Sequence, residues 1–392
     1  MNVLKNMALL FSLSFLVAAT CRAQDSATEW DALLTQTEGW LGADGIYSLD
    51  LNYDSEASLF DANKSDNQLS LFWFSDTICG KTKKNGAEYA QWQMINHSFA
   101  ILKGNAPDKE KIEFFLKSDS SIPGPKNIVS GHYWLQDGIR LGNRLWISAI
   151  LVGDAWKPKR VDAVTIGLNE ETKQPNFSDV VVDVNAPLSF KTDEAQVVWG
   201  AAICDDADQQ YIYIYGYVDR LKEWSRKDMV AARAPRDSFL KYDQWQYFDG
   251  QNWTNEPEAV LKREAALVRA VSTEFSVSKI PYGPSRDKYL LVYTPNVIGE
   301  RIAYRSGDSP VGPFDEEVVF YQSDIPRNIQ GVKCYNAKAH PIFADKTGVL
   351  VSYNVNRLGD IAKKPEEYRP RFVWLNWETI NAPPSSQNTS EN

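Results

Sequence analysis

Apolar and polar positions recur along the chain in pairs of strand-like runs. The clearest pair lies in residues 134–151, where an apolar run that carries Asp137 ends at Gly142-Asn143 and a second apolar run follows at once. A Gly-Asn pair between two runs of aromatic and β-branched residues is typical of a tight turn joining antiparallel strands. Residues 134–151 are therefore predicted to form a β-hairpin.

The same unit occurs four more times, each with an apolar first strand that carries a polar residue and an aromatic or β-branched second strand. The paired runs are residues 44–51 with 69–76, 197–203 with 211–218, 274–280 with 288–293, and 338–343 with 348–353. The second strands recur about every 60 to 80 residues, a spacing that suits a blade of four strands with loops. We predict an all-β fold, a five-bladed β-propeller. An open β-sandwich with irregular insertions is the alternative.

Three other segments complete the predicted domain. Residues 24–41 are predicted to contain a short helix, residues 92–102 one strand, and residues 371–377 a strand that pairs with the first or last blade and closes the ring. No linker rich in Pro, Gly or Ser interrupts the pattern, so we expect residues 24–382 to form a single domain. The polar tail of residues 383–392 is predicted to be disordered.

The first 23 residues have the three parts of a signal peptide. A basic start and an apolar core too short to span a membrane lead to small residues at a cleavage point after Ala23. We expect a secreted or periplasmic bacterial protein without a membrane span. Lipid anchoring through Cys21 is the alternative, although Thr20 stands where a lipoprotein signal has a smaller residue. Without Cys21 three cysteines remain, so at most one disulfide could form.

Charge and composition narrow the class of ligand. A net charge of −9, from 51 acidic and 42 basic residues, gives no electrostatic attraction to nucleic acid, and a neutral ligand fits better. With three histidines in all and no Cys-x-x-Cys spacing, we expect no metal site and no cofactor. Packing between blades explains most of the aromatic residues. Trp134 and Trp199, however, flank the polar ends of predicted first strands, where an indole could stack on a sugar ring.

The first strands of a propeller line a central funnel, where side chains from different blades converge. The residues at the strand mouths here are Asp44, Asp137, Trp199, Glu274 and His340. Glycosidic cleavage requires one protonated and one ionised carboxyl, so Asp44, Asp137 and Glu274 are predicted to be catalytic, with Glu274 or Asp137 as the proton donor. The alternative is that Asp44 and Asp137, each followed by Gly, cap turns. Glu274 opens a strand at a position where a turn does not require glutamate, so this alternative does not apply to it.

Six residues are predicted to bind the substrate. Lys338 and His340 stand two residues apart on one face of a strand, and they could bind substrate hydroxyls or tune a neighbouring acid. Asp76 ends a second strand, where it reaches the funnel rim or caps its own turn. The full set is Asp76, His132, Trp134, Trp199, Lys338 and His340. The protein is predicted to act as a monomer on a polysaccharide or oligosaccharide.

Several short motifs together resemble a known family. They are Asp44-Gly-Ile-Tyr-Ser, Phe74-Ser-Asp-Thr77, Trp199-Gly-Ala-Ala-Ile203, Glu274-Phe-Ser-Val277, Ser309-Pro-Val-Gly-Pro-Phe314 and Ala337-Lys-Ala-His-Pro341. The family consists of secreted bacterial five-bladed propellers that were long catalogued as a domain of unknown function, and some relatives are endo-acting D-arabinanases. The resemblance runs from about residue 38 to residue 378.

The chain is similar, more remotely, to the arabinanase and β-xylosidase clan of glycoside hydrolases. That clan places an Asp base, an Asp modulator and a Glu acid on its first three blades. This chain differs, because the first strand of its third hairpin carries Trp199, and the glutamate, Glu274, stands in the first strand of the fourth hairpin. The resemblance implies an exported glycoside hydrolase acting on a neutral polysaccharide, with arabinofuranose-containing glycans as candidates. A glycan-binding propeller without catalysis is the alternative, and the negative charge disfavours a lyase of uronate polymers.

Overall fold

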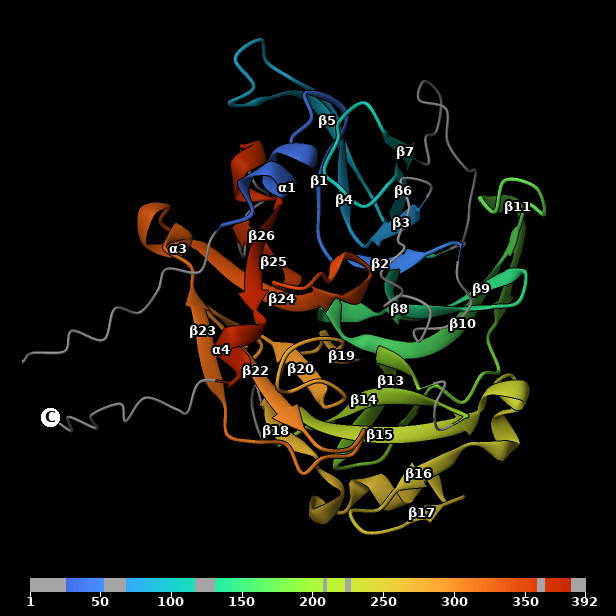
Figure 1. The fold of residues 1–392 in the computed structure, drawn as a ribbon. Coiled ribbons are helices and arrows are strands. Elements are labelled where there is room, and N and C mark those ends of the chain that lie inside the picture. Colours follow the sequence, from blue (N-terminus) through green and yellow to red (C-terminus); the bar gives the residue numbers. More distant parts are fainter. Residues whose placement is uncertain are drawn as a thin grey trace, which may run out of the picture.

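The computed structural model describes residues 26–52, 68–116, 131–206, 210–222, 227–357 and 364–381. The predicted signal peptide, with Cys21 and Ala23, and the predicted tail from residue 383 lie outside these ranges. The described residues form six β-sheets and only short helices, so the all-β prediction is confirmed (Figure 1). Within the same ranges, none of the helices has the length and apolar character needed to cross a bilayer.

Five sheets contain the five predicted hairpins, and we number them sheet 1 to sheet 5 in chain order. Sheet 1 has β2 (Tyr47–Asp50), β3 (Leu69–Phe74), β6 (Ser98–Lys103) and β7 (Ile112–Leu116). Sheet 2 has β8 (Tyr133–Leu141), β9 (Arg144–Val152), β10 (Pro158–Leu168) and β11 (Pro175–Asp183). Sheet 3 has β12 (Ser189–Lys191), β13 (Ala195–Asp206), β14 (Tyr211–Arg220), β15 (Lys227–Pro235), β16 (Gln246–Phe248), β17 (Trp253–Thr254) and β18 (Val268–Val271).

The last two sheets follow the same plan. Sheet 4 has β19 (Phe275–Lys279), β20 (Tyr289–Tyr293), β22 (Arg301–Gly307) and β23 (Val318–Gln322). Sheet 5 has β21 (Ile298–Gly299), β24 (Val332–His340), β25 (Gly348–Arg357) and β26 (Pro370–Asn376). In all five sheets the two strands of the predicted hairpin pair antiparallel.

A sixth, three-stranded sheet was not predicted. It contains β1 (Glu38–Ala43), β4 (Thr77–Thr82) and β5 (Tyr89–Ile95). The predicted helix is therefore too long: α1 covers only Thr28–Leu33, and Trp40 and Leu41 belong to β1. These two residues are both buried because both faces of β1 are covered, and successive strand residues point to opposite faces. The single strand predicted for residues 92–102 is likewise wrong, since it is divided between β5 and β6.

The N-terminal segment joins the outer edge of sheet 5. Ser26 forms a bridge with Val373 of β26, and the Ala27 amide donates to the Phe372 carbonyl at 3.1 Å. The Phe372 amide in turn donates to the Asp31 carboxylate at 2.8 Å. The strand predicted at residues 371–377 thus belongs to the last sheet, where β26 pairs with β25. Two further short helices are α3 (Ile325–Asn328) and α4 (Trp377–Asn381).

The first strands of the five hairpins form a closed circuit of contacts. β2 contacts β8, β8 contacts β13, β13 contacts β19, β19 contacts β24, and β24 contacts β2. Figure 1 shows these strands near the middle of the molecule, with the later strands of each sheet further out. The apolar core fills the spaces between neighbouring sheets; for example, Phe72 of β3 stacks at 5.5 Å on Phe343, which follows β24.

Three first strands carry β-bulges, in β8 between Leu135 and Gly138, in β13 between Trp199 and Ala202, and in β24 between Tyr335 and Lys338. A bulge leaves backbone groups unpaired and turns side chains away from their regular direction. Side chains of neighbouring sheets bind the freed groups. The Trp73 indole donates to the Gln136 carbonyl at 2.7 Å, and the Ser148 hydroxyl donates to the Trp199 carbonyl at 3.0 Å.

Candidate active site

Asp44 lies in the turn between β1 and β2, beside the end of β3. Its amide donates to the Asp76 carbonyl at 3.2 Å, and its carbonyl accepts from the Ser75 amide at 2.9 Å. Gly45 has φ +56°, and an added Cβ would lie 2.5 Å from the Ser75 hydroxyl oxygen, so the turn requires glycine. The Asp44 carboxyl accepts a hydrogen bond from the Tyr335 hydroxyl at 2.8 Å. The turn therefore holds this carboxyl against sheet 5.

Two other acids influence the Asp44 carboxyl. Burial, followed by the charges of Asp76 and Glu274, raises the pKa of Asp44 well above its usual range, against the opposing hydrogen bonds from Tyr335 and Tyr368. Carboxyls crowded in this way cannot all ionise together. Asp44 and Glu274, predicted to share a site, are thus close enough to interact, and Asp44 keeps its proton to a higher pH than an exposed aspartate does.

Glu274 immediately precedes β19 and is bound by side chains of β24. Its Oε1 accepts from the Asn336 side-chain amide at 2.8 Å, and its Oε2 accepts from the Lys338 ammonium. The Lys338 side chain is only 2 % exposed, and its nitrogen lies 4.2 Å from the centre of the Tyr47 ring. The ion pair presents Glu274 as a carboxylate whose charge is balanced inside the protein.

Tyr47 of β2 interacts with this ion pair and with Asp137. Burial, then the charges of Glu274 and Asp137, and a hydrogen bond to Glu274 raise the pKa of Tyr47 well above its usual range. The phenol therefore stays protonated at any physiological pH. Tyr47 therefore interacts with two of the three predicted catalytic acids, Glu274 and Asp137.

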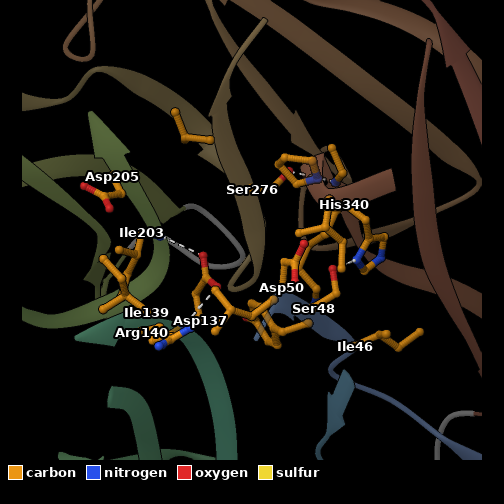
Figure 2. Close-up of a pocket in the computed structure, with 18 of the residues that line it drawn as sticks. Ile46, Ser48, Asp50, Asp137, Ile139, Arg140, Ile203, Asp205, Ser276 and His340 are labelled. Atoms are coloured by element: carbon orange, nitrogen blue, oxygen red, sulfur yellow. Dashed lines mark hydrogen bonds between the residues drawn. The ribbon is translucent and has the colours of Figure 1, made fainter. Parts of the chain in front are cut away.

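Asp137 occupies the bulge of β8 and reaches across to β13. Its carboxylate accepts from the Gly138 amide at 2.9 Å and from the Ile203 amide at 2.7 Å. Figure 2 shows this carboxylate pointing toward Ile203. Burial raises the pKa of Asp137 to about 7, against the two backbone hydrogen bonds and the charge of Lys338. Asp137 therefore titrates near neutrality.

Asp137 also faces a cavity that all five first strands help to line. The polar side chains around it include Asp50, Asp137, Asp205, Ser276, Lys338 and His340 (Figure 2). Asp44 and Glu274 are not part of this lining. The three predicted catalytic acids thus form two groups. Asp44 and Glu274 form one, and Asp137, which lines the cavity, forms the other. Lys338 interacts with Glu274 and with Asp137 and so connects the two groups.

The predicted substrate-binding residues Asp76, His132 and Trp134 form one cluster. His132 Nε2 lies 2.9 Å from one Asp76 oxygen, and the Trp134 indole donates to the other at 3.1 Å. The hydrogen bond to Asp76 raises the pKa of His132. The Asp76 side chain thus binds Trp134 of β8 and His132, which directly precedes β8, rather than capping its own turn. Its backbone contact with Asp44 places the cluster beside the acids.

The structure corrects the expected position of Trp199. Trp199 is fully buried among sheets 2 to 4, with its ring 5.6 Å from that of Tyr247, so no ligand can stack on it. Trp199 pairs with Gly216 immediately before the bulge of β13, and its indole packs in the core. Alternation along a strand shows which residues share a face, but not which face turns to the core.

His340 lines the cavity, but both of its ring nitrogens already have partners. Nδ1 lies 2.7 Å from the Ser48 hydroxyl, and Nε2 lies 2.8 Å from the Ser352 hydroxyl. Burial, with the nearby charge of Lys338, lowers the pKa of His340 to about 3. The imidazole is therefore neutral, and the predicted binding of substrate hydroxyls by His340 would need one of these hydrogen bonds to break.

The sequence analysis missed Tyr47, Tyr335, Asn336 and Tyr368. Asn336 could have been found, because residues 336, 338 and 340 share one face of a regular strand. Tyr368 could not, since it lies in the turn before β26 and reaches the Asp76 carbonyl, at 2.9 Å, only through the closure of the ring. Among the described residues, no three His, Cys, Asp or Glu side chains are arranged to hold a metal ion.

A comparison with protein families identifies this chain. The family described as Domain of unknown function (DUF5005) matches residues 27–377. The chain belongs to the DUF5005 family. The match covers all five sheets and every acid discussed above. No curated protein matched the sequence of this DUF5005 member.

Solved structures show what the DUF5005 fold is similar to. A putative hydrolase from Bacteroides ovatus ATCC 8483 is 18 % identical and has a TM-score of 0.67, over 91 % of this chain and 92 % of that one. The two proteins therefore share a fold. The GH43_1 enzyme from Xanthomonas citri, complexed with xylose, gives a TM-score of 0.45 at 10 % identity, over 89 % and 93 % of the two chains. An exo-β-1,3-galactanase from Phanerochaete chrysosporium gives 0.42 at 11 % identity, over 86 % of this chain and 60 % of its own.

Proposed function

We propose that this DUF5005 protein is a glycoside hydrolase, in which Asp137 is the proton donor and Glu274 is the ionised carboxylate. The observation that supports the proposal most strongly is the contrast between these two acids. Asp137 has a pKa of about 7, whereas Glu274 is paired with the Lys338 ammonium. Two carboxyls held in different protonation states are what glycosidic cleavage requires.

The choice of Asp137 over Glu274 as proton donor follows from their partners. Asn336 and Lys338 both donate to Glu274, and donors of this kind favour the charged form of a carboxyl. Within the described residues, the Asp137 carboxylate accepts from two backbone amides and from no charged donor, and it faces the cavity, where a leaving oxygen could approach it. In this scheme Asp44 stays protonated beside Glu274 and tunes its reactivity.

We also propose that sheets 1 to 5 are the five blades of a propeller. The closed circuit of contacts between β2, β8, β13, β19 and β24 supports this assignment. The sheet of β1, β4 and β5 would then be an insertion in the first blade. Closure would be completed by the N-terminal segment on β26.

The proposed substrate is a neutral polysaccharide, with arabinofuranose-containing glycans as the first candidates. The net charge of −9 and the acids near the centre would repel an anionic polymer. We further propose export, on the basis of the signal-peptide pattern of residues 1–23. Mass spectrometry of the mature N-terminus checks this, because an intact Met1 would contradict it.

The hydrolase proposal is tested by the release of reducing ends from arabinan, arabinogalactan, xylan and galactan. We expect release from at least one polymer, and a loss of about 10² to 10⁴ in rate for Glu274→Gln. Glu171→Gln, at an exposed turn, is the matched control and should keep the wild-type rate. Equal rates for the two variants would contradict the role of Glu274.

A glycan-binding protein without catalysis is the second candidate. One observation favours it, since both Glu274 oxygens are already occupied by Asn336 and Lys338. Binding of a polymer with no release of reducing ends, under any of the conditions tested, would support this candidate over the hydrolase.

A further inference from the structure

Trp156 presents a large aromatic surface to solvent at the connection between β9 and β10. It ends a short 3-10 turn (Asp154–Trp156), and 64 % of the residue is exposed. Its ring lies parallel to that of Trp134, with centroids 6.2 Å apart and planes at 4°. It also meets the His132 ring edge-on, at 5.6 Å. One indole face is thus supported by the protein while much of the side chain stays open.

The backbone of this connection is strained. Ala155 has φ 54° and Trp156 has φ 58°, in the left-handed region that residues with a Cβ rarely occupy. The Gly153 amide donates to the Lys157 carbonyl at 2.8 Å and closes the loop. Two left-handed residues and an exposed indole both oppose folding, so stability of the chain does not explain them. Strain of this kind concentrates at functional sites.

The polar groups beside Trp156 lead toward the candidate acids. His132 and Trp134, which touch Trp156, both bind the Asp76 carboxylate. Asp76 in turn bonds through its carbonyl to the Asp44 amide. A sugar ring has an apolar C–H face and a rim of hydroxyls, so an aromatic face next to a carboxylate and an imidazole matches its chemistry.

We propose that Trp156 is the stacking wall of a sugar-binding subsite next to the acid cluster, and that it holds one residue of a neutral glycan chain. The inference rests on the glycan ligand of the proposed function but not on hydrolysis. A sugar on Trp156 would direct the rest of the chain past Asp76 toward Asp44 and Glu274. Trp156 then acts by positioning the substrate.

The test is affinity electrophoresis of the full chain in native gels that contain arabinan, arabinogalactan, xylan or galactan. We expect the wild type to be retarded by at least one polymer, and Trp156→Ala to bind it roughly three- to tenfold more weakly, the range for the loss of an aromatic contact. Trp156→Phe, which keeps a ring, should recover most of the binding. Trp92→Ala is the control, because Trp92 is also an exposed indole, 37 % exposed, but lies on β5.

The outcomes separate this inference from the hydrolase proposal. Retardation that depends on Trp156 but not on Trp92, without release of reducing ends, supports the subsite and contradicts hydrolysis. Retardation or cleavage that Trp156→Ala leaves unchanged overturns the subsite alone. If none of the four polymers retards the wild type and none is cleaved, both proposals fail. A lowered kcat with unchanged KM for Trp156→Ala would also contradict a role in positioning.

Discussion

The Lys338 ammonium binds the Glu274 carboxylate although the two residues are 64 positions apart in the sequence. Lys338 belongs to sheet 5 and Glu274 precedes the first strand of sheet 4, so the ion pair joins neighbouring sheets at the centre of the ring. The side chains are 2 % and 14 % exposed. With so little water near them, each charge depends on the other for its stabilisation.

Loss of the lysine alone should therefore destabilise the protein strongly. We expect Lys338→Met to lower the free energy of unfolding by about 3 to 5 kcal/mol, the usual cost of leaving a buried partner unpaired. Urea denaturation measures the change. The double variant Lys338→Met with Glu274→Gln is the control and should recover most of the loss. Equal stability of the wild type and Lys338→Met would show that the pair is not a buried one.

The raised pKa of Asp137 should make stability depend on pH. The folded protein holds this proton more tightly than the unfolded chain does, so the stabilisation is complete below about pH 4 and is lost as the pH rises toward 7. Between these values, the free energy of unfolding of the wild type should fall relative to that of Asp137→Asn. Asp193→Asn, at an exposed position, should follow the wild type. Parallel curves for the wild type and Asp137→Asn would contradict the shift.

The histidines offer a direct spectroscopic check, because the chain has only three. His132 should titrate above the usual value of 6.5, since its hydrogen bond to Asp76 stabilises the protonated ring. His340 should stay neutral down to about pH 3. Imidazole NMR signals followed against pH report both, with His132→Gln and His340→Gln to assign them. A His340 signal that moves near pH 6.5 would contradict its burial between Ser48 and Ser352.

The hairpins could be predicted because local signals specify them. The turn at Gly142-Asn143 and the apolar run of Leu145 to Leu151 depend only on neighbouring residues, and the five predicted strand pairs all occur. The sheet of β1, β4 and β5 could not be predicted in the same way. Its strands come from segments separated by β2 and β3, and the pairing depends on tertiary contacts.

Part of the candidate site could be predicted from local signals, as the hairpins were. Asp44, Glu274 and Asp76 lie at the ends of strands, where position along the repeat indicates direction. Trp199 was misplaced because the strand period does not show which face of β13 turns to the core, where the indole packs. The pairing of Glu274 with Lys338 depends on which sheets become neighbours, and this is a property of the closed ring rather than of either segment.

The most direct test of the proposed mechanism is kcat/KM as a function of pH, measured on a cleaved polysaccharide for the wild type and Asp137→Asn. A general acid must be protonated, so wild-type activity should fall as the pH rises through about 7, the pKa of Asp137. Asp137→Asn should lose a factor of about 10² to 10⁴ and no longer show that decline, with a smaller loss on an activated aryl glycoside. Full wild-type activity at pH 9, or an Asp137→Asn variant as active as the wild type, would contradict the assignment of Asp137 as the proton donor.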